Sequence, residues 1–446
     1  MVPASSQADP GRPAAQGPPD SPRYWLPLFV AAWVLSALIS TYLVFLPGYT
    51  GDVKHYKYWT RVVTTEGIQS IYGGEYPETY AIYPPVTLYA YGVVGRVYQR
   101  FAQDPWETER MLESERFSAA IKGVSIVFHL VLGASIYGLL WKLYGGRAGS
   151  LGSSAYLLNP AVIFDVAYWG QPDAAHSLFA VLALGLTLLG WWQGSWVAAG
   201  LAAMTKPQAW ALMPLFFIVQ IRRSGVSRTA LGVLIAAAVV LLVVSPFILH
   251  GRVHEFLTLP ERISSVMPVA SANAHNLWWI VTNNPAPVVL DSERVLGPLT
   301  YRQVALPLVL AVAALALWRL LTAPGISIFF IGGYQAFGWF CFTTQAHENH
   351  YFFALPLLIM AMPVAPAARV LTLILSATLL VNMAVHDPAL IEHMEALASD
   401  AARHQLQILN SWANLAVFAG WSAVLVWAPR WCGVPIAGTP APAPTP

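Results

Sequence analysis

Residues 24–46 read YWLPLFVAAWVLSALISTYLVFL, and this stretch contains no charged side chain. It is as long as the run of about 20 apolar residues that a helix needs to cross the hydrocarbon core of a bilayer. Similar stretches recur as far as Trp427, and hydrophobic residues make up 57% of the 446-residue chain while charged residues make up only 10%. The sequence therefore predicts an all-α fold, a polytopic transmembrane helical bundle with about 11–13 membrane segments.

The two ends of the chain differ in composition from the rest. Residues 1–22 and 431–446 are rich in Pro and Ala and poor in large apolar side chains, so both are predicted to be disordered. Residues 23–430 are expected to form one transmembrane domain, in which 24–46 is retained because no A-x-A cleavage signature follows it. The apolar stretches predict the lipid bilayer as a partner. The net charge of only +2 and the lack of a nucleic-acid-binding motif predict that the protein does not bind nucleic acid.

The placement of Lys and Arg predicts the orientation of the spans. Short basic connections, such as those at 142–147 and 222–228, are assigned to the cytoplasm together with both termini. Long external loops then cover 47–116, 249–300 and 387–408, and the first of them is expected to carry juxtamembrane helices. The expected spans are 24–46, 117–143, 149–168, 174–193, 195–221 (broken), 227–248, 301–321, 325–344, 351–366, 369–386 and 409–429.

Two segments do not fit a simple crossing. Residues 195–205 reach only about 16 Å as a helix, and Pro207 disfavours helix at Lys206, so a half-membrane hairpin is expected over 195–221. Residues 84–100 are only moderately apolar and contain two arginines. They are predicted to form an interfacial or re-entrant helix within the first external loop.

Polar side chains gather in three stretches that this orientation places on the outer face. Ionisable groups at membrane depth are costly, so they favour a functional interpretation. A carboxylate ringed by aromatic residues at a membrane–water boundary, as Asp52 is, suits a general base. The stretches are Gly51-Asp52 with His55, Tyr56 and Trp59; Tyr168-Trp169-Gly170-Gln171-Pro172-Asp173; and Gln345-Ala346-His347-Glu348-Asn349-His350.

The first two stretches also fit structural roles. Asp52 follows Gly51 ahead of a predicted helix, which is typical of an N-cap, and a capping role is compatible with a role as base. Gln171 and Asp173 fit a polar external turn. The Trp169 ring beside them also offers a stacking surface for a sugar.

The third stretch also fits an interhelical hydrogen-bond network. His347 and His350 stand three residues apart, but the pattern is not the H-E-x-x-H metal motif. Lys206 adds a cation at apparent membrane depth, which needs either a protein carboxylate or a bound phosphate as its partner. Tyr83 precedes two prolines, a turn signal that favours the start of a helix.

The order of these signals resembles the GT-C superfamily of integral-membrane glycosyltransferases, which use polyprenyl- or dolichyl-phosphate sugars. The similarity covers residues 24–430. It is closest to bacterial relatives of the GPI mannosyltransferases, and the ER dolichyl-phosphate-glucose glucosyltransferases share a Gly-Asp loop and a His-Glu pair. The ordered signals are Asp52 after the first span, Tyr83-Pro84-Pro85, Arg116 at the second long span, Trp169-Gly170-Gln171-Pro172-Asp173, Thr205-Lys206-Pro207-Gln208 and His347-Glu348-Asn349-His350.

The resemblance implies an inverting transfer of a hexose, with mannose expected, from a polyprenyl-phosphate sugar to a lipid-linked glycan or protein acceptor. The reaction would take place at the extracytoplasmic face of a bacterial plasma membrane. Asp52 would deprotonate the acceptor hydroxyl, and His347, with Lys206 as a second candidate, would stabilise the leaving phosphate. The remaining candidates would bind the sugar or the acceptor. They are Trp59, Tyr83, Trp169, Gln171, Asp173, Glu348 and His350.

No metal or other cofactor is expected. A lipid phosphate carries less charge than a nucleotide diphosphate, and Lys54 stands where a D-x-D motif would place its second carboxylate. Asn349 and His350 depart from the usual continuation in the ER enzymes, which leaves the role of His350 open. The alternative function is a membrane transporter or lipid flippase, which predicts ionisable residues along a membrane path and repeated halves. Here the ionisable residues gather at one face.

Overall fold

The computed structural model of the chain describes residues 22–73, 81–102, 106, 108–283, 289–323, 325–395 and 399–433. Residues 1–21 of the predicted leader and 434–446 of the predicted tail lie outside the described residues, so the disorder predicted for them stays a prediction. Pro22 begins a helix, and Trp431 and Cys432 belong to a 3₁₀ turn, so the prediction of disorder is wrong for these residues.

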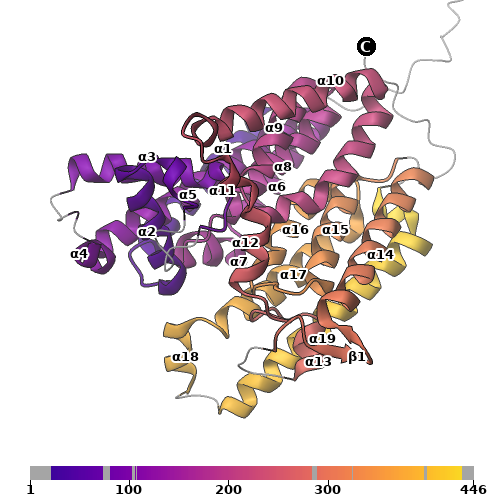
Figure 1. Cartoon of the computed structure of the whole chain (residues 1–446). Helices are drawn as coiled ribbons and strands as arrows, with labels where there is room; N and C mark the ends of the chain where they lie inside the picture. The colour runs from indigo at the N-terminus through magenta and orange to yellow at the C-terminus, as the bar shows by residue number, and fades with distance from the viewer. Residues whose placement is uncertain are drawn as a thin grey trace, which may run out of the picture.

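Long helices dominate the described chain and confirm the predicted polytopic helical bundle (Figure 1). Six helical stretches are long and apolar enough to cross a membrane, by length and composition. The third of them begins with the 3₁₀ turn η4 (Pro207–Leu212). The long helices are α1 (Pro22–Leu43), α5 (Glu115–Tyr144), α10 (Met213–Leu249), α14 (Tyr301–Thr322), α17 (Pro366–Ala384) and α19 (Asp400–Trp427).

Shorter apolar helices lie between the long ones. Several are almost wholly buried, which explains why they show little amphipathic pattern. They are α6 (Gly146–Leu157), α7 (Pro160–Ile163), the π-helical turn η3 (Phe164–Trp169), α8 (Asp173–Leu188), α9 (Trp192–Ala203), α15 (Ile328–Phe342), the 3₁₀ turn η5 (His350–Phe353) and α16 (Ala354–Ala361).

The three predicted external loops contain short elements of their own. Loop 249–300 holds a small antiparallel hairpin, which is a departure from an all-α chain within the described residues. The elements are α2 (Thr50–Thr65), η1 (Ile68–Ser70), α3 (Pro85–Phe101) and α4 (Thr108–Glu113); α11 (Val253–Leu257), α12 (Leu259–Val266), α13 (Leu277–Thr282), β1 (Arg294–Leu296) and β2 (Leu299–Thr300); and α18 (Pro388–Glu395), with η6 (Pro429–Cys432) after α19.

The helix breaks follow from individual residues. Lys206 has extended backbone angles (φ −152°, ψ 142°), so the predicted break before Pro207 is confirmed. Gly225 bends α10 sharply, because its φ of 81° is outside the helical range. The predicted span over 149–168 is not a single regular helix, because the helix is interrupted at Leu158 and Asn159. Asn159 accepts hydrogen bonds from two backbone N–H groups and starts a new helix there, next to Pro160.

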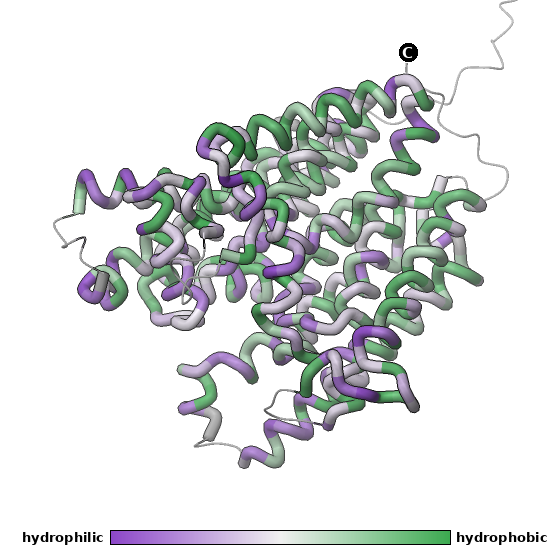
Figure 2. The backbone as a smooth tube through the Cα atoms, viewed as in Figure 1, coloured by the Kyte–Doolittle hydropathy of each residue, from purple (hydrophilic) through white to green (hydrophobic). Residues whose placement is uncertain are grey.

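Hydrophobic residues are spread along the long helices, whereas hydrophilic residues are frequent in short elements such as α4, α11 and α18 and in the β1 hairpin (Figure 2). The largest buried cluster joins α5, α6, α8, α15, α16 and α17. A second cluster joins α2 and α3 to the start of α5 and the end of α10, and it is rich in aromatic rings. This second cluster holds the described part of the segment 47–116 against the bundle.

Helix α3 is not among the helices that meet the length and hydropathy needed for a span. It packs closely on α2: a Cβ added at Gly95 would lie 2.1 Å from the Thr64 hydroxyl oxygen. The start of α3 is tied to the end of α9, because the Val86 N–H donates to the Met204 carbonyl (2.8 Å). The Tyr83-Pro84-Pro85 signal therefore marks a helix start, as predicted, and it also brings Tyr83 close to Lys206.

Candidate active site

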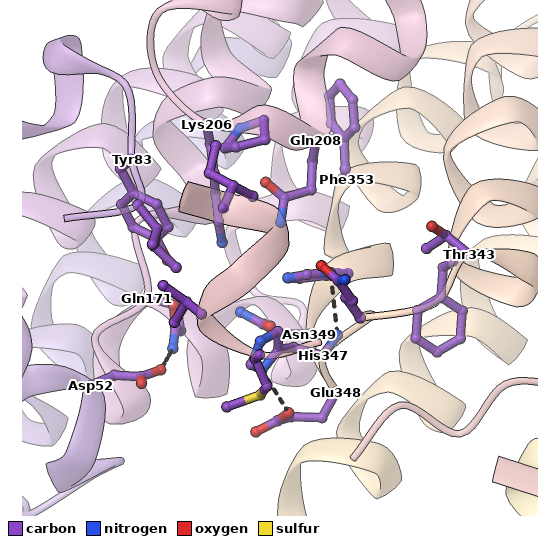
Figure 3. A pocket seen from close by; sticks show the side chains of 18 of the residues that line it. Asp52, Tyr83, Gln171, Lys206, Gln208, Thr343, His347, Glu348, Asn349 and Phe353 are labelled. Carbon is purple, nitrogen blue, oxygen red and sulfur yellow. Dashed lines mark hydrogen bonds and ion pairs between the residues drawn. The ribbon is translucent and has the colours of Figure 1, made fainter. Parts of the chain in front are cut away.

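A cavity of about 440 Å³ lies where α2, the 81–84 loop, η4, the end of α15 and the 343–350 segment meet. Most of the candidates from the sequence line it, although they come from distant parts of the chain (Figure 3). Trp169 and Asp173 do not line the cavity. The candidates that do are Asp52, Trp59, Tyr83, Gln171, Lys206, His347, Glu348 and His350.

Asp52 lies in the first turn of α2, where a carboxylate is favoured by the helix dipole. The helix begins at Thr50, and its N-cap residue, Tyr49, makes no side-chain cap hydrogen bond. The interpretation of Asp52 as an N-cap is therefore wrong. Its carboxylate is left available to other partners.

The Asp52 carboxylate is held by an amide of fixed orientation. Gln171 Nε2 donates to Asp52 Oδ2 (Figure 3), and the Tyr56 hydroxyl donates to Gln171 Oε1 (2.8 Å). Because an ionised carboxylate only accepts hydrogen bonds, the amide NH₂ faces Asp52 and the amide oxygen faces the Tyr56 hydroxyl. This arrangement fixes one carboxylate oxygen and leaves the other for a substrate.

The environment of Asp52 makes it a stronger base than an exposed aspartate. Burial raises the pKa of Asp52, because it disfavours the charged form. The positive charge of His347 and the hydrogen bond from Gln171 act in the opposite direction, and the net direction is upward. A higher pKa gives the carboxylate a greater affinity for a proton taken from an acceptor.

Gln171 is presented by a tight turn between η3 and α8. Gly170 has a φ of 84°, and a Cβ there would lie 2.5 Å from Lys122 Cγ, so the turn requires glycine. The Gly170 carbonyl accepts a hydrogen bond from the Ser125 hydroxyl (3.0 Å), and the Gln171 N–H donates to the Asp165 carbonyl (3.0 Å). The turn is thus fixed from both sides.

His347 and Glu348 form an ion pair on the other side of the cavity. His347 Nδ1 lies 3.7 Å from Glu348 Oε2, and the Glu348 side chain is almost fully buried. Burial by itself disfavours the charged form of His347, but the Glu348 carboxylate and Asp52 outweigh it and raise the pKa of His347. Burial likewise opposes ionisation of Glu348, but His347 lowers its pKa. The site therefore favours an imidazolium ion facing the cavity.

The segment that carries this pair is clamped by Asp291, a fully buried carboxylate. Asp291 accepts two hydrogen bonds from the Arg302 guanidinium (2.9 and 3.0 Å), one from the Thr344 hydroxyl (3.2 Å) and one from Gln345 Nε2 (2.8 Å). Gln345 itself has a positive φ of 61°, which this clamp maintains. No motif in the sequence pointed to Asp291.

Two further backbone contacts hold the same segment. The Gln345 N–H donates to the Val269 carbonyl, and the Ala272 N–H donates to the Ala346 carbonyl (both 2.9 Å). The His347 N–H donates to His350 Nδ1 (3.2 Å). His350, whose role the sequence left open, therefore orders this turn as well as lining the cavity.

The predicted need of Lys206 for a partner is met by a carboxylate. Lys206 Nζ donates to Asp173 Oδ1 (2.6 Å), and both side chains are about 2% exposed. Asn349 Nδ2 donates to the other oxygen, Asp173 Oδ2 (2.6 Å), and more weakly to Asp165 Oδ1 (3.3 Å). The ammonium also lies 5.2 Å from the centre of the Tyr83 ring. Asp173 thus stands behind Lys206 and does not face the cavity.

Trp169 is fully buried and serves the frame around the site. Its indole N–H donates to Asp387 Oδ2 (2.7 Å), and its ring lies 4.7 Å from that of Tyr49. Asp387 also accepts from the Tyr168 hydroxyl (3.2 Å) and the Leu390 N–H (2.9 Å). The turn that presents Gln171 is therefore tied to the start of α18.

The sequence also left several site residues unassigned. Asn349 belongs to the His347-Glu348-Asn349-His350 motif, and its hydrogen bond to Asp173 joins the stretches 168–173 and 345–350. Tyr56 was noted beside Asp52, but its contact with Gln171 depends on the fold. Gln208, within the Thr-Lys-Pro-Gln element, lines the cavity. No short motif marks Asp291, because Thr344 and Gln345 follow it by 53 and 54 residues along the chain.

Comparison with known proteins gives only a likeness to solved structures. No protein-family model and no curated protein matches the sequence. The chain is similar to ArnT from Cupriavidus metallidurans bound to undecaprenyl phosphate, with a TM-score of 0.47 and 13% identity. Its similarity to the apo state has a TM-score of 0.45 and 15% identity, and both matches cover 92% of this chain and 78% of that one. At these TM-scores the likeness supports no statement about activity or ligands.

Proposed function

We propose that this chain is an inverting membrane glycosyltransferase of the GT-C type. It transfers a hexose, with mannose as the expected sugar, from a polyprenyl-phosphate donor to a lipid-linked glycan or protein acceptor at the extracytoplasmic face. The observation that carries the proposal is the placement of a carboxylate, Asp52, and a histidine paired with a carboxylate, His347, on one cavity of about 440 Å³, with the pKa of both groups raised.

Asp52 acts as the general base. Its Oδ2 is occupied by Gln171, so the second oxygen accepts the proton of the acceptor hydroxyl as that oxygen attacks the anomeric carbon. The bond from the anomeric carbon to the phosphate oxygen breaks on the opposite side, which inverts the configuration. Proton transfer to a positioned base contributes about 10²–10⁴-fold to a rate.

His347 stabilises the leaving polyprenyl phosphate. Its positive charge, maintained by Glu348, offsets the negative charge that develops on the phosphate oxygen. Lys206 has its first hydrogen bond committed to Asp173, but an ammonium carries three donors and this one lines the cavity. Its positive charge, close to the start of η4, stabilises the leaving phosphate and provides a second contact to it.

The other cavity residues orient the reactants. Trp59 and Tyr83 form part of an aromatic wall, with ring centres 5.3 Å apart in an edge-to-face arrangement, which suits the apolar face of a sugar. Gln171 acts on Asp52, and Glu348 acts on His347, so both contribute by positioning. Lys206 and His347 place two cationic side chains on the cavity, although each also contacts a carboxylate, and we propose that they take the place of a metal in the reaction.

The test is a transfer assay on membranes that contain the protein, with radiolabelled polyprenyl-phosphate sugars. Wild type is expected to transfer mannose, and Asp52→Asn is expected to lose about 10²–10⁴-fold in rate. Asp400→Asn is the matched control, because Asp400 is 81% exposed and does not line the cavity. Equal turnover by Asp52→Asn and wild type would eliminate Asp52 as the base. Absence of transfer from any lipid-phosphate sugar by wild type would reject the proposed function.

A further inference from the structure

His55 is the basic residue of α2 that faces the cavity. It lines the cavity and is exposed, and its imidazole forms no hydrogen bond or ion pair with another described residue. The other basic side chains of this helix differ from it. Lys57 Nζ donates to two backbone carbonyls (2.7 and 2.9 Å), and Lys54 and Arg61 do not line the cavity. A side chain that is exposed and also forms part of the wall marks the mouth of a cavity.

Helix α2 places His55 beside the proposed base. Residues three apart on a helix lie on one face with their Cβ atoms about 5–6 Å apart, so His55 follows Asp52 by one turn. Asp52 is partly exposed, and Tyr56, the residue after His55, is buried and donates to Gln171. The helix therefore turns its His55 edge towards water and its Tyr56 edge into the protein.

The mouth has two sides of different chemistry. Besides His55, the exposed residues of the cavity wall are Val266 and Met267 at the end of α12, each 42% exposed. Lys206 is deeply buried by comparison, and it lies on a different side of the cavity from Asp52 (Figure 3). The polar side of the mouth is thus next to the base, and the apolar side is formed by α12.

On the proposed mechanism, the acceptor occupies the outer part of the cavity. Its reacting hydroxyl lies at the free oxygen of Asp52, while the leaving phosphate lies with His347 and the buried Lys206. The part of the acceptor that does not react then continues towards water. The next residue that it meets on the cavity face of α2 is His55.

The chemistry of the mouth indicates which acceptor fits. A neutral imidazole has one donor and one acceptor, and a hydroxyl can act as either, so the two pair in both tautomers. A sugar carries such a hydroxyl on the carbon next to the one that reacts, whereas a serine or threonine side chain has only one hydroxyl. A peptide would also bring backbone N–H and C=O groups against Val266 and Met267, whose side chains offer no hydrogen-bond partner.

We infer that His55 binds a second hydroxyl of the acceptor, next to the one that reacts, and that the acceptor is a sugar and not a protein side chain. This inference rests on the proposed function and adds an acceptor-binding residue to it. Loss of the imidazole affects the acceptor and not the donor, because His55 lies at the mouth whereas Lys206 is buried.

The test measures transfer from radiolabelled polyprenyl-phosphate mannose to octyl mannoside by purified full-length protein. His55→Ala is expected to raise the KM for octyl mannoside about tenfold, as for the loss of one hydrogen bond, with the KM for the donor unchanged. His55→Asn keeps a donor and an acceptor and is expected to lose less. Lys54→Ala is the control, because Lys54 is exposed on the same helix but does not line the cavity.

Monodeoxy octyl mannosides, each without one hydroxyl, show whether the effect comes from a hydrogen bond. The analogue without the reacting hydroxyl gives no product, and the analogue without its neighbour is expected to have a KM about tenfold higher with wild type. His55→Ala is expected to use that second analogue and the parent compound equally well, because the partner of the missing hydroxyl is already gone.

The outcomes separate this inference from the function on which it rests. An unchanged KM for octyl mannoside in His55→Ala, or a lower kcat with an unchanged KM, would show that His55 does not bind the acceptor, although the proposed transfer can still stand. Transfer by wild type to a serine- and threonine-containing peptide, and not to octyl mannoside, would also overturn the inference and leave the transfer standing. Transfer to neither acceptor would overturn both.

Discussion

Replacement of Lys206 by methionine gives a sharp test of the site, because Lys206 has one role that the structure shows and another that is proposed. The variant removes the ammonium that lies 2.6 Å from Asp173 Oδ1, with both side chains about 2% exposed. Removal of one partner of a buried pair leaves an uncompensated charge and costs about 3–5 kcal/mol. Asn349 still donates to Asp173 Oδ2, so the expected loss is at the lower end, about 3 kcal/mol.

The loss is measured as the change in unfolding free energy of the protein in detergent, with Lys54→Met as the control because Lys54 is exposed on α2. The double variant Lys206→Met/Asp173→Asn removes both charges. It is expected to recover most of the stability, with a coupling of about 2–3 kcal/mol between the two substitutions.

Activity then separates the two roles of Lys206. If the ammonium also contacts the donor phosphate, the double variant regains stability but stays at least tenfold below wild type in transfer. If the double variant regains both, Lys206 acts only by neutralising Asp173. A loss in Lys206→Met no greater than that in Lys54→Met would refute the reasoning altogether, because the pair would then not be a buried ion pair in the native protein.

Three further predictions concern the charge of His347, the support of the segment that carries it, and the need for a metal. The kcat/KM of wild type should rise with pH as Asp52 ionises and fall at higher pH as His347 loses its proton. Glu348→Gln should lower the pKa of His347, so the fall in kcat/KM should begin at lower pH. If the fall stays at the same pH, Glu348 does not maintain the charge of His347. Asp291→Ala should leave the hydrogen-bond donors of Arg302 and of the 343–350 segment without an acceptor. The resulting misplacement of His347 should lower kcat by about 10–100-fold in steady-state assays. Unchanged kinetics would show that Asp291 does not position His347. Chelation with EDTA should leave the transfer rate unchanged, and a loss that added Mg²⁺ or Mn²⁺ reverses would contradict metal independence.

The class of fold followed from hydropathy, because a chain that spans a membrane must keep long apolar helices. The breaks were partly predictable. Pro207 indicated the interruption at Lys206, and the structure shows extended backbone there. The interruption at Asn159 was not predicted, because the apolar residues of 149–168 indicate one span and outweigh the local Asn159-Pro160 signal for a new helix start.

The site was predictable at the level of which stretches meet, but less so for individual roles. The order of motifs placed Asp52, Gln171 and His347 together, and all three line one cavity. Which side chain faces inwards depends on packing that one sequence does not display. Asp173 is turned away because it pairs with Lys206, and Trp169 because its indole donates to Asp387.

The long separation in sequence between the two walls of the cavity has a consequence for biosynthesis. Asp52, in α2, and Gln171, in the turn before α8, leave the ribosome early, whereas the segment with His347 and its clamp residue Asp291 follows much later. Membrane insertion proceeds from the N-terminus, so the nascent chain contains Asp52 and Lys206 long before it contains His347, the main group proposed to stabilise the leaving phosphate. On the proposed mechanism, partly synthesised chains therefore cannot transfer sugar from the lipid donors around them. Transfer activity requires the last third of the protein.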